Sequence, residues 1–178
     1  MPVKAVHFKK ILYTTDLSDT ALNAFSYAVS LANCYGANIT ILHVLSEQIS
    51  VEPYLAGILS EEQLQAIQER HRDEAREALI GKSRENVVVE EALNQFAENV
   101  QEDPQNLSFN LDEVLVLRGD PAEKILEVAH EFNFDLIVMG THGRGLIKEM
   151  LGSTVRKVTQ RSEVPVLSVR LKEKAVKK

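Results

Sequence analysis

The feature that most constrains the fold is a set of short apolar runs that alternate with helical patterns. The run Ile39–Leu45 is rich in β-branched residues and almost wholly apolar, as expected for a strand whose two faces are both covered by helices. Runs of similar character are predicted as the other strands: Ile11–Tyr13, Val114–Leu117, Leu136–Met139 and Val164–Val169. Because strands and helices alternate, the chain is expected to form a parallel α/β sheet with right-handed crossovers.

Capping residues and apolar spacing predict the helices between these strands. Ser18 lies where a helix N-cap belongs, and apolar residues recur at helical spacing until Gly36, which predicts a helix over about 19–35. The run Asp120-Pro121-Ala122-Glu123 has a capping aspartate and a proline at the first helical position, so a second helix should extend to about Phe132. Val155 and Val158 mark a further helix that starts near Gly152.

The segment of about 46–110 is longer than a simple crossover requires. Ser60-Glu61-Glu62-Gln63 predicts a capping box and a helix that continues to Gly81. A second helical segment is expected around Val89 to Val100, because Asp103-Pro104 would end it. A chain of 178 residues suits one domain, so we expect a single domain over 1–178 with an enlarged helical segment.

Composition excludes several classes of function. A formal net charge of -6 argues against a general affinity for nucleic acid, because phosphate contacts demand a basic surface. No run approaches the roughly 18 apolar residues of a membrane span, and the N-terminal residues do not form a signal peptide. We therefore expect a cytoplasmic protein with no membrane partner. The lone Cys34 cannot form an internal disulfide, and we predict a small buried side chain rather than a reactive thiol.

Two glycine clusters bracket the loop between the last two predicted strands. Gly140-Thr141-His142-Gly143-Arg144-Gly145 follows Met139 directly, and Gly152-Ser153-Thr154 opens the next helix. Glycine lets backbone amides approach a bulky anion, and a helix N-terminus offers unpaired amides and partial positive charge. The pattern predicts a phosphate-binding loop from Gly140 to Ser153. A flexible connection ending in a Gly-Ser helix cap is the alternative interpretation.

Other nucleotide-binding motifs do not fit this loop. It lacks the Gly-Lys-Ser/Thr of a Walker A loop and the G-x-G-x-x-G spacing of a dinucleotide fingerprint. The hydroxyls of Ser153 and Thr154 could bind phosphate, with cationic help from Arg144, Lys148 or His142. His142 could also move protons, but we expect it to order the loop through a hydrogen bond.

Four motifs in order carry a resemblance to a known family. They are Lys9–Ser18, Leu42–Val44, Gly119–Ala122 and the stretch from Met139 to Thr154. With them, the chain resembles the universal stress protein family, of the ATP-binding type, over almost its full length. The resemblance implies an open five-stranded parallel sheet in the order 3-2-1-4-5 with helices on both faces, Rossmann-like and of the adenine nucleotide alpha hydrolase kind. It brings Asp16 and Gly140 together where the strand order reverses.

The resemblance also implies which residues bind the ligand, which would be ATP or a related adenine nucleotide, with or without Mg²⁺. Positions after the first strand and at the end of the second surround adenine and ribose in ATP-binding members, and the glycines and the Gly-Ser pair hold the phosphates. The residues assigned in this way are Thr14, Thr15, Asp16, Val44, Met139, Gly140, His142, Gly143, Arg144, Gly152, Ser153 and Thr154. Turn formation is the alternative role for Asp16, and core packing is the alternative role for Val44.

The loop departs from the family pattern in length. Eight residues separate Gly143 from Gly152, whereas the ATP-binding pattern has nine between these glycines. Loss of one residue could tighten the loop or shift Gly152 relative to the phosphates.

The last predicted strand is expected at a sheet edge, because Pro165 removes a backbone donor. The resemblance implies a homodimer through Val166 to Arg170. We expect a nucleotide-binding stress-response or regulatory protein with little or no turnover and no assigned catalytic residue. The alternatives are a slow ATPase or phosphotransferase that uses Asp16 and Mg²⁺, and a dimeric interaction module that binds no nucleotide.

Overall fold

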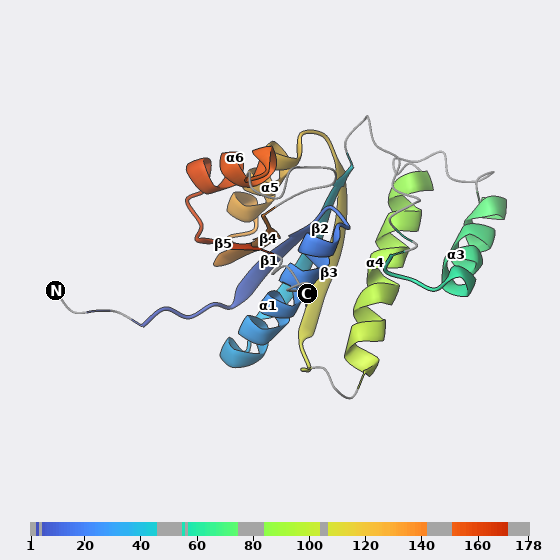
Figure 1. Cartoon of the computed structure of the whole chain (residues 1–178), viewed down its shortest axis with the longest axis horizontal. Helices are drawn as coiled ribbons and strands as arrows, with labels where there is room; N and C mark the ends of the chain where they lie inside the picture. The colour runs from blue at the N-terminus through green and yellow to red at the C-terminus, as the bar shows by residue number, and fades with distance from the viewer. Residues whose placement is uncertain are drawn as a thin grey trace, which may run out of the picture.

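The computed structural model of the chain describes residues 5–45, 57–74, 84–103, 107–141 and 151–170, together with Val3 and Leu55. Its centre is a five-stranded sheet in the order β3-β2-β1-β4-β5 (Figure 1). The strands are β1 (Lys10–Thr15), β2 (Asn38–Leu45), β3 (Asn110–Arg118), β4 (Leu136–Gly140) and β5 (Val166–Val169). Every neighbouring pair is parallel. The predicted fold class and strand order are confirmed.

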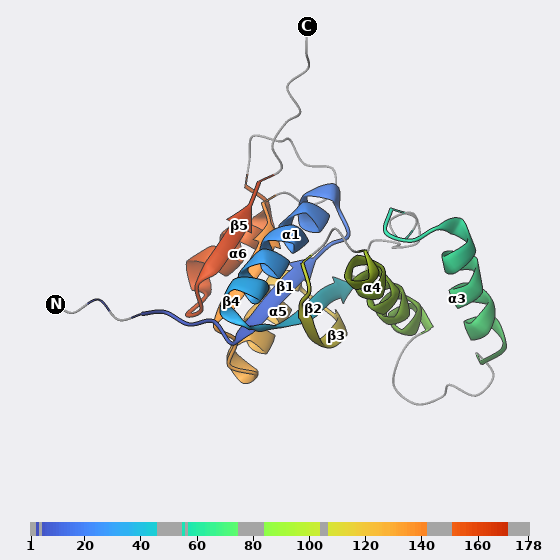
Figure 2. The same cartoon turned by 90° about the horizontal axis from the view of Figure 1, so that it is seen from below.

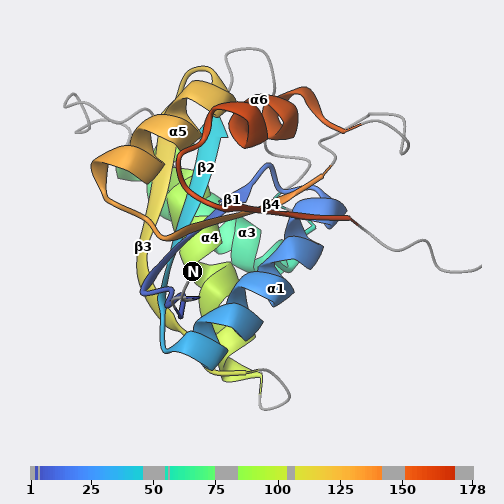
Figure 3. The same ribbon diagram turned by 90° about the vertical axis from the view of Figure 1, so that its left-hand side faces the viewer.

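Helices cover both faces of this sheet. They are α1 (Asp19–Tyr35), α3 (Glu61–Glu74), α4 (Arg84–Glu102), α5 (Pro121–Glu131) and α6 (Ser153–Arg161). Helices α5 and α6 lie side by side on one face, and α1 and α4 cover the other (Figures 1 and 3). Helix α3 packs on the side of α4 that faces away from the sheet (Figure 2). The site at the strand ends is therefore built between two layers of helices.

Several strand boundaries differ from those expected, and β3 begins at Asn110 rather than Val114. β1 does not end at Tyr13 but includes Thr14 and Thr15, because these β-branched residues are buried and pair with β2. Gly140 is the last residue of β4 rather than the first of the loop. The last strand, β5, begins at Val166, after Pro165, rather than at Val164. β5 lies at the edge of the sheet as predicted.

The predicted helix ends around α1 and α5 are confirmed by their caps. The Ser18 side chain accepts a hydrogen bond from the amide of Ala21, and Gly36 adopts the left-handed conformation with φ 66° that ends α1. At α5, the Asp120 carboxylate accepts from the amide of Glu123 at 3.1 Å. Both helices thus begin at the edge of the sheet where the strands end.

The enlarged helical segment contains the two expected helices. The capping box is formed, since Ser60 N donates to Gln63 Oε1 at 3.1 Å and Gln63 N donates to Ser60 Oγ at 3.2 Å. The described part of this helix is α3, and the rest of its predicted extent to Gly81 lies outside the described residues. Helix α4 occupies the second predicted position and buries Val89 and Leu93. That all residues form one domain stays a prediction.

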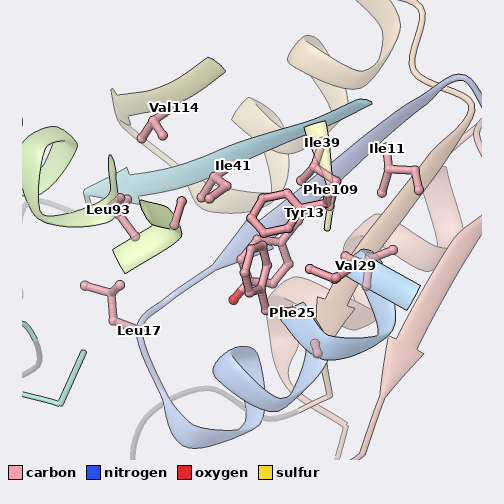
Figure 4. Packing of buried hydrophobic residues seen from close by; sticks show 14 of the residues in the cluster. Ile11, Tyr13, Leu17, Phe25, Val29, Ile39, Ile41, Leu93, Phe109 and Val114 are labelled. Carbon is pink, nitrogen blue, oxygen red and sulfur yellow. The ribbon is translucent and has the colours of Figure 1, made fainter. Parts of the chain in front are cut away.

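Strand alternation divides the core into two clusters, one on each face of the sheet. On the face of α1 and α4, Tyr13 packs on Phe25 with ring centroids 4.9 Å apart, and Phe25 packs on Phe109 at 5.4 Å (Figure 4). On the opposite face, Leu12 and Ile137 pack among buried residues of α5 and α6. A strand residue therefore packs either against α1 and α4 or against α5 and α6, depending on the face of the sheet on which it lies.

The prediction for Cys34 is wrong, because its side chain is exposed. Cys34 follows the buried Ala32 by two positions on α1. Two positions turn a side chain by about 200° around a helix, so Cys34 points away from the sheet.

Among the helices of the described residues, none is both long enough and apolar enough to cross a lipid bilayer.

Candidate functional site

The carboxyl ends of β1 and β4 meet at the centre of the sheet. The two strands are neighbours, and Thr14 pairs with Met139. Because the strand order reverses between β1 and β4, their ends form the position at which open α/β sheets bind ligands. The structure thus brings the segment of Asp16 together with Gly140, as expected. Val44, near the end of β2, lies on the other side of β1.

The turn from β1 to α1 is held by its own side chains. The amide of Leu17 donates to Thr15 Oγ1 at 2.9 Å, and the amide and hydroxyl of Ser18 donate to Asp16 Oδ1 at 3.0 and 2.6 Å. Asp16 therefore does form the turn, which is the alternative role considered for it. A carboxylate has about four acceptor positions, so this role leaves capacity for a ligand hydroxyl or cation.

Leu17 occupies a strained position in the same turn. Its φ of 64° lies in the left-handed region, which costs a leucine about 1 kcal/mol or more. Its side chain is buried in the cluster on the face of α1 and α4, on the same side of the sheet as Leu93 (Figure 4). Core packing thus offsets the strain and holds the turn in one conformation.

Gly140 is required by packing at the end of β4. A Cβ atom at this position would lie 2.9 Å from the backbone nitrogen of Ala21 and 2.9 Å from the carbonyl carbon of Thr20. These are backbone atoms in the first turn of α1, so they cannot move aside cheaply. Packing alone therefore accounts for a glycine at position 140, with no need for a bound phosphate. The contact also shows that the N-terminus of α1 lies against β4.

Hydrogen bonds join the two ends of the glycine-rich loop. The amide of Thr141 donates to the carbonyl of Val169 at 2.9 Å, and the amide of Gly152 donates to the carbonyl of Thr141 at 2.9 Å. The start of α6 is therefore fixed beside the end of β4, which brings Gly152 close to Gly140. Three of the predicted ligand residues, His142, Gly143 and Arg144, lie outside the described residues.

The N-terminus of α6 suits an anion. Gly152 is its N-cap and has no side chain, and the first intrahelical bond runs from the amide of Arg156 to the carbonyl of Gly152 at 3.0 Å. The amides of Ser153, Thr154 and Val155 precede that bond, as in any helix N-terminus. No acidic residue lies in this first turn. Amides and helix dipole together favour a phosphate at this point.

Two other helices that begin at this edge, α1 and α5, carry a carboxylate at their start. Asp16 is bonded to the N-cap of α1, and Asp120 is itself the N-cap of α5. The amide of Glu123 lowers the pKa of Asp120, and the ammonium of Lys157 lowers it further. Unlike the starts of α1 and α5, the start of α6 carries no carboxylate, so its amides can bind an external anion.

Two ion pairs join α6 to α5. Lys157 lies 3.2 Å from Asp120, and Arg161 binds Glu123 through both terminal guanidinium nitrogens, with 3.1 Å between Nη2 and Oε2. The bond from Arg161 also lowers the pKa of the Glu123 carboxyl. Each pair is about half exposed, so its stabilisation is small, but together the pairs orient α6. Sequence reasoning missed them, although basic residues spaced i, i+4 on α6 match acidic residues spaced i, i+3 on α5.

The strand residues assigned to the ligand differ in exposure. Thr14, Thr15 and Met139 are 6%, 6% and 4% exposed, so little of their surface is open to a ligand. Val44 is half-buried on the face of α5 and α6, where it packs against the core. Its core-packing role is therefore present.

Two further apolar residues lie beside Val44. Val44 pairs with Leu117 of β3, and Leu115 lies two residues earlier on the same face of that strand. Both leucines are partly buried against the same cluster as Val44. Sequence reasoning did not assign them to the site, because only the register of β2 and β3 shows that they lie next to Val44.

Metal binding by protein side chains alone has no support in the described part of the chain. No group of three or more histidine, cysteine, aspartate or glutamate residues there could hold a metal ion.

Comparison with known proteins agrees with the fold and the motifs. The sequence profile of the universal stress protein family matches residues 7–170. Universal stress protein MJ0577 of Methanocaldococcus jannaschii is 31% identical, over 94% of this chain and 98% of its own length. Universal stress protein YxiE of Bacillus subtilis is 36% identical, over 92% of this chain and 99% of its own. The solved UspA from Lactobacillus plantarum has a TM-score of 0.60 at 26% identity, covering 93% of this chain and 100% of its own.

Some solved proteins of this fold hold adenine nucleotides. A universal stress protein in complex with cAMP has a TM-score of 0.55 at 21% identity and covers 93% of this chain and 98% of its own. One from Archaeoglobus fulgidus in complex with dAMP has a TM-score of 0.54 at 17% identity and covers 93% of this chain and 100% of its own. At these identities the likeness lies in the fold. From the family profile and the full-length relatives, the present chain belongs to the universal stress protein family.

Proposed function

We propose that this chain is a nucleotide-binding stress-response or regulatory protein with little or no turnover. Its ligand is ATP or a related adenine nucleotide, held between the β1–α1 turn and the start of α6. The observation that carries the proposal is the 2.9 Å hydrogen bond from the amide of Gly152 to the carbonyl of Thr141. Through it, the N-terminus of α6 lies beside the end of β4, where an anion gains from amides and helix dipole.

The two ends of the nucleotide meet different chemistry in this proposal. The phosphates accept hydrogen bonds from the start of α6, with the hydroxyls of Ser153 and Thr154 adding donors. Adenine and ribose lie nearer β2, where Val44 and Leu117 supply apolar surface and Asp16 supplies a carboxylate for ribose hydroxyls. The loop residues His142, Gly143 and Arg144 complete the phosphate contacts in the same proposal.

Mg²⁺ fits this arrangement only as a companion of the phosphates. The ion keeps several waters and uses one or two carboxylates in nucleotide sites, and the carboxylate of Asp16 directly after β1 could be one of them. Asp16 would hold the ion, and the ion would neutralise phosphate charge. We assign no proton transfer to any residue, which accords with little or no turnover.

The complexes of this fold with cAMP and dAMP support the adenine part of the proposal. These two ligands share adenine and one phosphate. These complexes do not fix the number of phosphates in the ligand. That number depends on the loop, which in this chain has eight residues between Gly143 and Gly152.

The direct test is mass spectrometry of any nucleotide released from the purified, denatured protein, followed by calorimetric titration with ATP, ADP and AMP. The double variant Ser153→Ala/Thr154→Ala removes two hydroxyl donors and should weaken phosphate binding about tenfold or more. Ser30→Ala is the matched control, because Ser30 bonds the carbonyl of Ser26 on an exposed face of α1. Absence of both released nucleotide and binding would refute the proposal.

Turnover and the interaction-module alternative are tested on the same protein. A rate of ATP hydrolysis no faster than in buffer, with nucleotide still bound, would reject the slow ATPase or phosphotransferase. Gly143→Val should abolish nucleotide binding if the glycine loop holds phosphate. An unchanged titration would favour a dimeric module without nucleotide.

The proposal includes a homodimer in the cytoplasm. β5 lies at the edge of the sheet, and an edge strand can pair with the same strand of a second copy, here through Val166 to Arg170. Sedimentation at tens of micromolar protein should show a dimer, and a monomer would remove this part of the proposal.

A further inference from the structure

His43 is a buried polar residue behind the candidate site. It is 3% exposed and lies directly opposite Thr15 in the pairing of β2 with β1. Its neighbours on the same face of β2, Ile41 and Leu45, are buried apolar residues of the core. A histidine in such a row needs a hydrogen-bonding partner, because an unpaired buried polar group is costly.

One hydrogen-bonding partner of the ring is the carbonyl of Thr15. Nδ1 of His43 lies 2.7 Å from this oxygen. A carbonyl oxygen can only accept, so Nδ1 is the donor and carries a hydrogen. Thr15 is the last residue of β1, and its carbonyl belongs to the peptide bond that enters Asp16. The ring therefore holds the peptide plane from which the Asp16 carboxylate extends.

The peptide plane is the starting point of a turn with one defined geometry. After it, Leu17 is bonded to Thr15 and has the positive φ, and Ser18 is bonded to Asp16. A rotation of the plane before Asp16 would change the direction of its carboxylate and the two amide bonds that follow. His43 thus acts on the turn through the backbone and from the α1 and α4 face, away from α5 and α6.

We propose, on the basis of the nucleotide-binding function above, that His43 is a positioning residue that orients Asp16 for the ligand by fixing the Thr15 carbonyl. It does not touch the nucleotide. The carboxylate is the group that meets the ribose or the metal, and the buried ring determines where that carboxylate lies.

Two substitutions separate this role from simple core packing. His43→Asn places an amide nitrogen near the position of Nδ1 and can still donate to the Thr15 carbonyl. His43→Leu removes the donor and keeps apolar volume. A residue that only fills the core would be replaced at least as well by leucine as by asparagine.

The first measurement needs no ligand. Amide hydrogen exchange of Leu17 and Ser18 is followed by NMR in the full-length protein, with the amide of Ile137 as the reference, because it donates to Pro165 elsewhere in the sheet. His43→Leu should speed exchange at Leu17 and Ser18 about tenfold relative to Ile137, which is the effect of losing one ordinary hydrogen bond. His43→Asn should restore most of the protection. Unchanged exchange in His43→Leu would overturn the inference.

The second measurement is the affinity for ATP in a double-mutant cycle with Asp16→Ala. His43→Leu should weaken binding about five- to tenfold in the wild-type background and have no further effect in Asp16→Ala, because the two residues then act as one unit. An equal loss in both backgrounds would overturn the role of His43 in orienting Asp16.

The outcomes separate this inference from the proposed function. A wild-type protein that binds no nucleotide would refute the proposed function. In that case, faster amide exchange at Leu17 and Ser18 in His43→Leu, with protection retained in His43→Asn, would still show that His43 stabilises the turn after β1.

Discussion

Gly140 at the end of β4 lies so close to the first turn of α1 that an added Cβ atom would be 2.9 Å from the backbone nitrogen of Ala21. The two residues are far apart in the sequence, and no local pattern links them. The contact means that one glycine of the predicted phosphate loop is required by the packing of a helix against a strand. It also connects the two segments that form the candidate site.

Gly140→Ala is therefore expected to destabilise the protein whether or not nucleotide is bound. The new methyl group would meet backbone atoms of Thr20 and Ala21, and overpacking of this kind costs about 1 to 3 kcal/mol. For a domain of this size that corresponds to a fall in Tm of about 2 to 12 °C. Thermal unfolding followed by circular dichroism is the measurement.

Gly36→Asn is the control for this substitution. Gly36 has a φ of 66°, and an added Cβ atom there would have no heavy atom within 4 Å. Asparagine tolerates the left-handed conformation at a helix C-terminus, so only a small change in Tm is expected. If the two variants lost equal stability, the close contact of Gly140 would not be the cause.

Tyr13→Phe tests a buried hydroxyl in the core beneath the site. The Tyr13 hydroxyl donates to the carbonyl of Ala21 at 2.8 Å, and its loss should cost about 1 kcal/mol near neutral pH, as measured by urea unfolding.

The same residue predicts a dependence on alkaline pH. Burial raises the pKa of Tyr13 far above its ordinary value of 10.0, so above about pH 10 the unfolded chain releases this proton while the native protein keeps it. The stability associated with Tyr13 is thus present below that pH and is lost as pH rises. The stability of Tyr13→Phe should fall less steeply above pH 10 than that of the wild type. If the free energy of unfolding fell equally steeply with pH in both proteins, Tyr13 would not be the source of the alkaline pH dependence.

Asp120 predicts a dependence on acid pH. Its pKa is lowered mainly by the amide of Glu123 and further by Lys157, so its contribution is present above an ordinary value of 3.8 and is lost as pH falls through the native pKa. Asp120→Ala should cost about 1 kcal/mol near neutral pH through loss of the N-cap of α5. Asp120→Asn keeps a capping oxygen and should lose less.

Urea unfolding over a range of pH checks this prediction. The difference in stability between the wild type and Asp120→Asn should shrink as pH falls below about 4, because protonation removes the charge that distinguishes them. A difference that is independent of pH would show that the Asp120 charge does not contribute.

Asp135 should stabilise the other end of the sheet. Its Oδ2 accepts from the amides of Lys9 and Lys10 at 2.7 and 2.9 Å, which joins the start of β1 to the start of β4. Asp135→Ala leaves both amides to water and should cost about 1 kcal/mol, whereas Asp135→Asn keeps an acceptor. Because this end lies opposite the candidate site, ATP affinity should be unchanged in both variants.

Local features of the sequence determined the elements and the place of the glycine-rich loop. The apolar runs predicted the parallel strands, and Ser18, Gly36, Ser60 and Asp120 marked helix ends that the structure confirms. These signals act between residues at most a few positions apart, so they are visible in the order of residues alone. The strand order came from the resemblance to a family, because no local pattern specifies which strands become neighbours.

Only the tertiary structure decided which side chains meet. The hydrogen bond of His43 to Thr15, the contact of Gly140 with Ala21 and the exposure of Cys34 depend on register and on how helices pack on the sheet. Such contacts join segments that are distant in the chain, and their geometry is set by the packing of many residues at once. The sequence by itself therefore placed the loop after β4, whereas the fold determined that α6 offers its N-terminus and that a buried histidine supports the turn of Asp16.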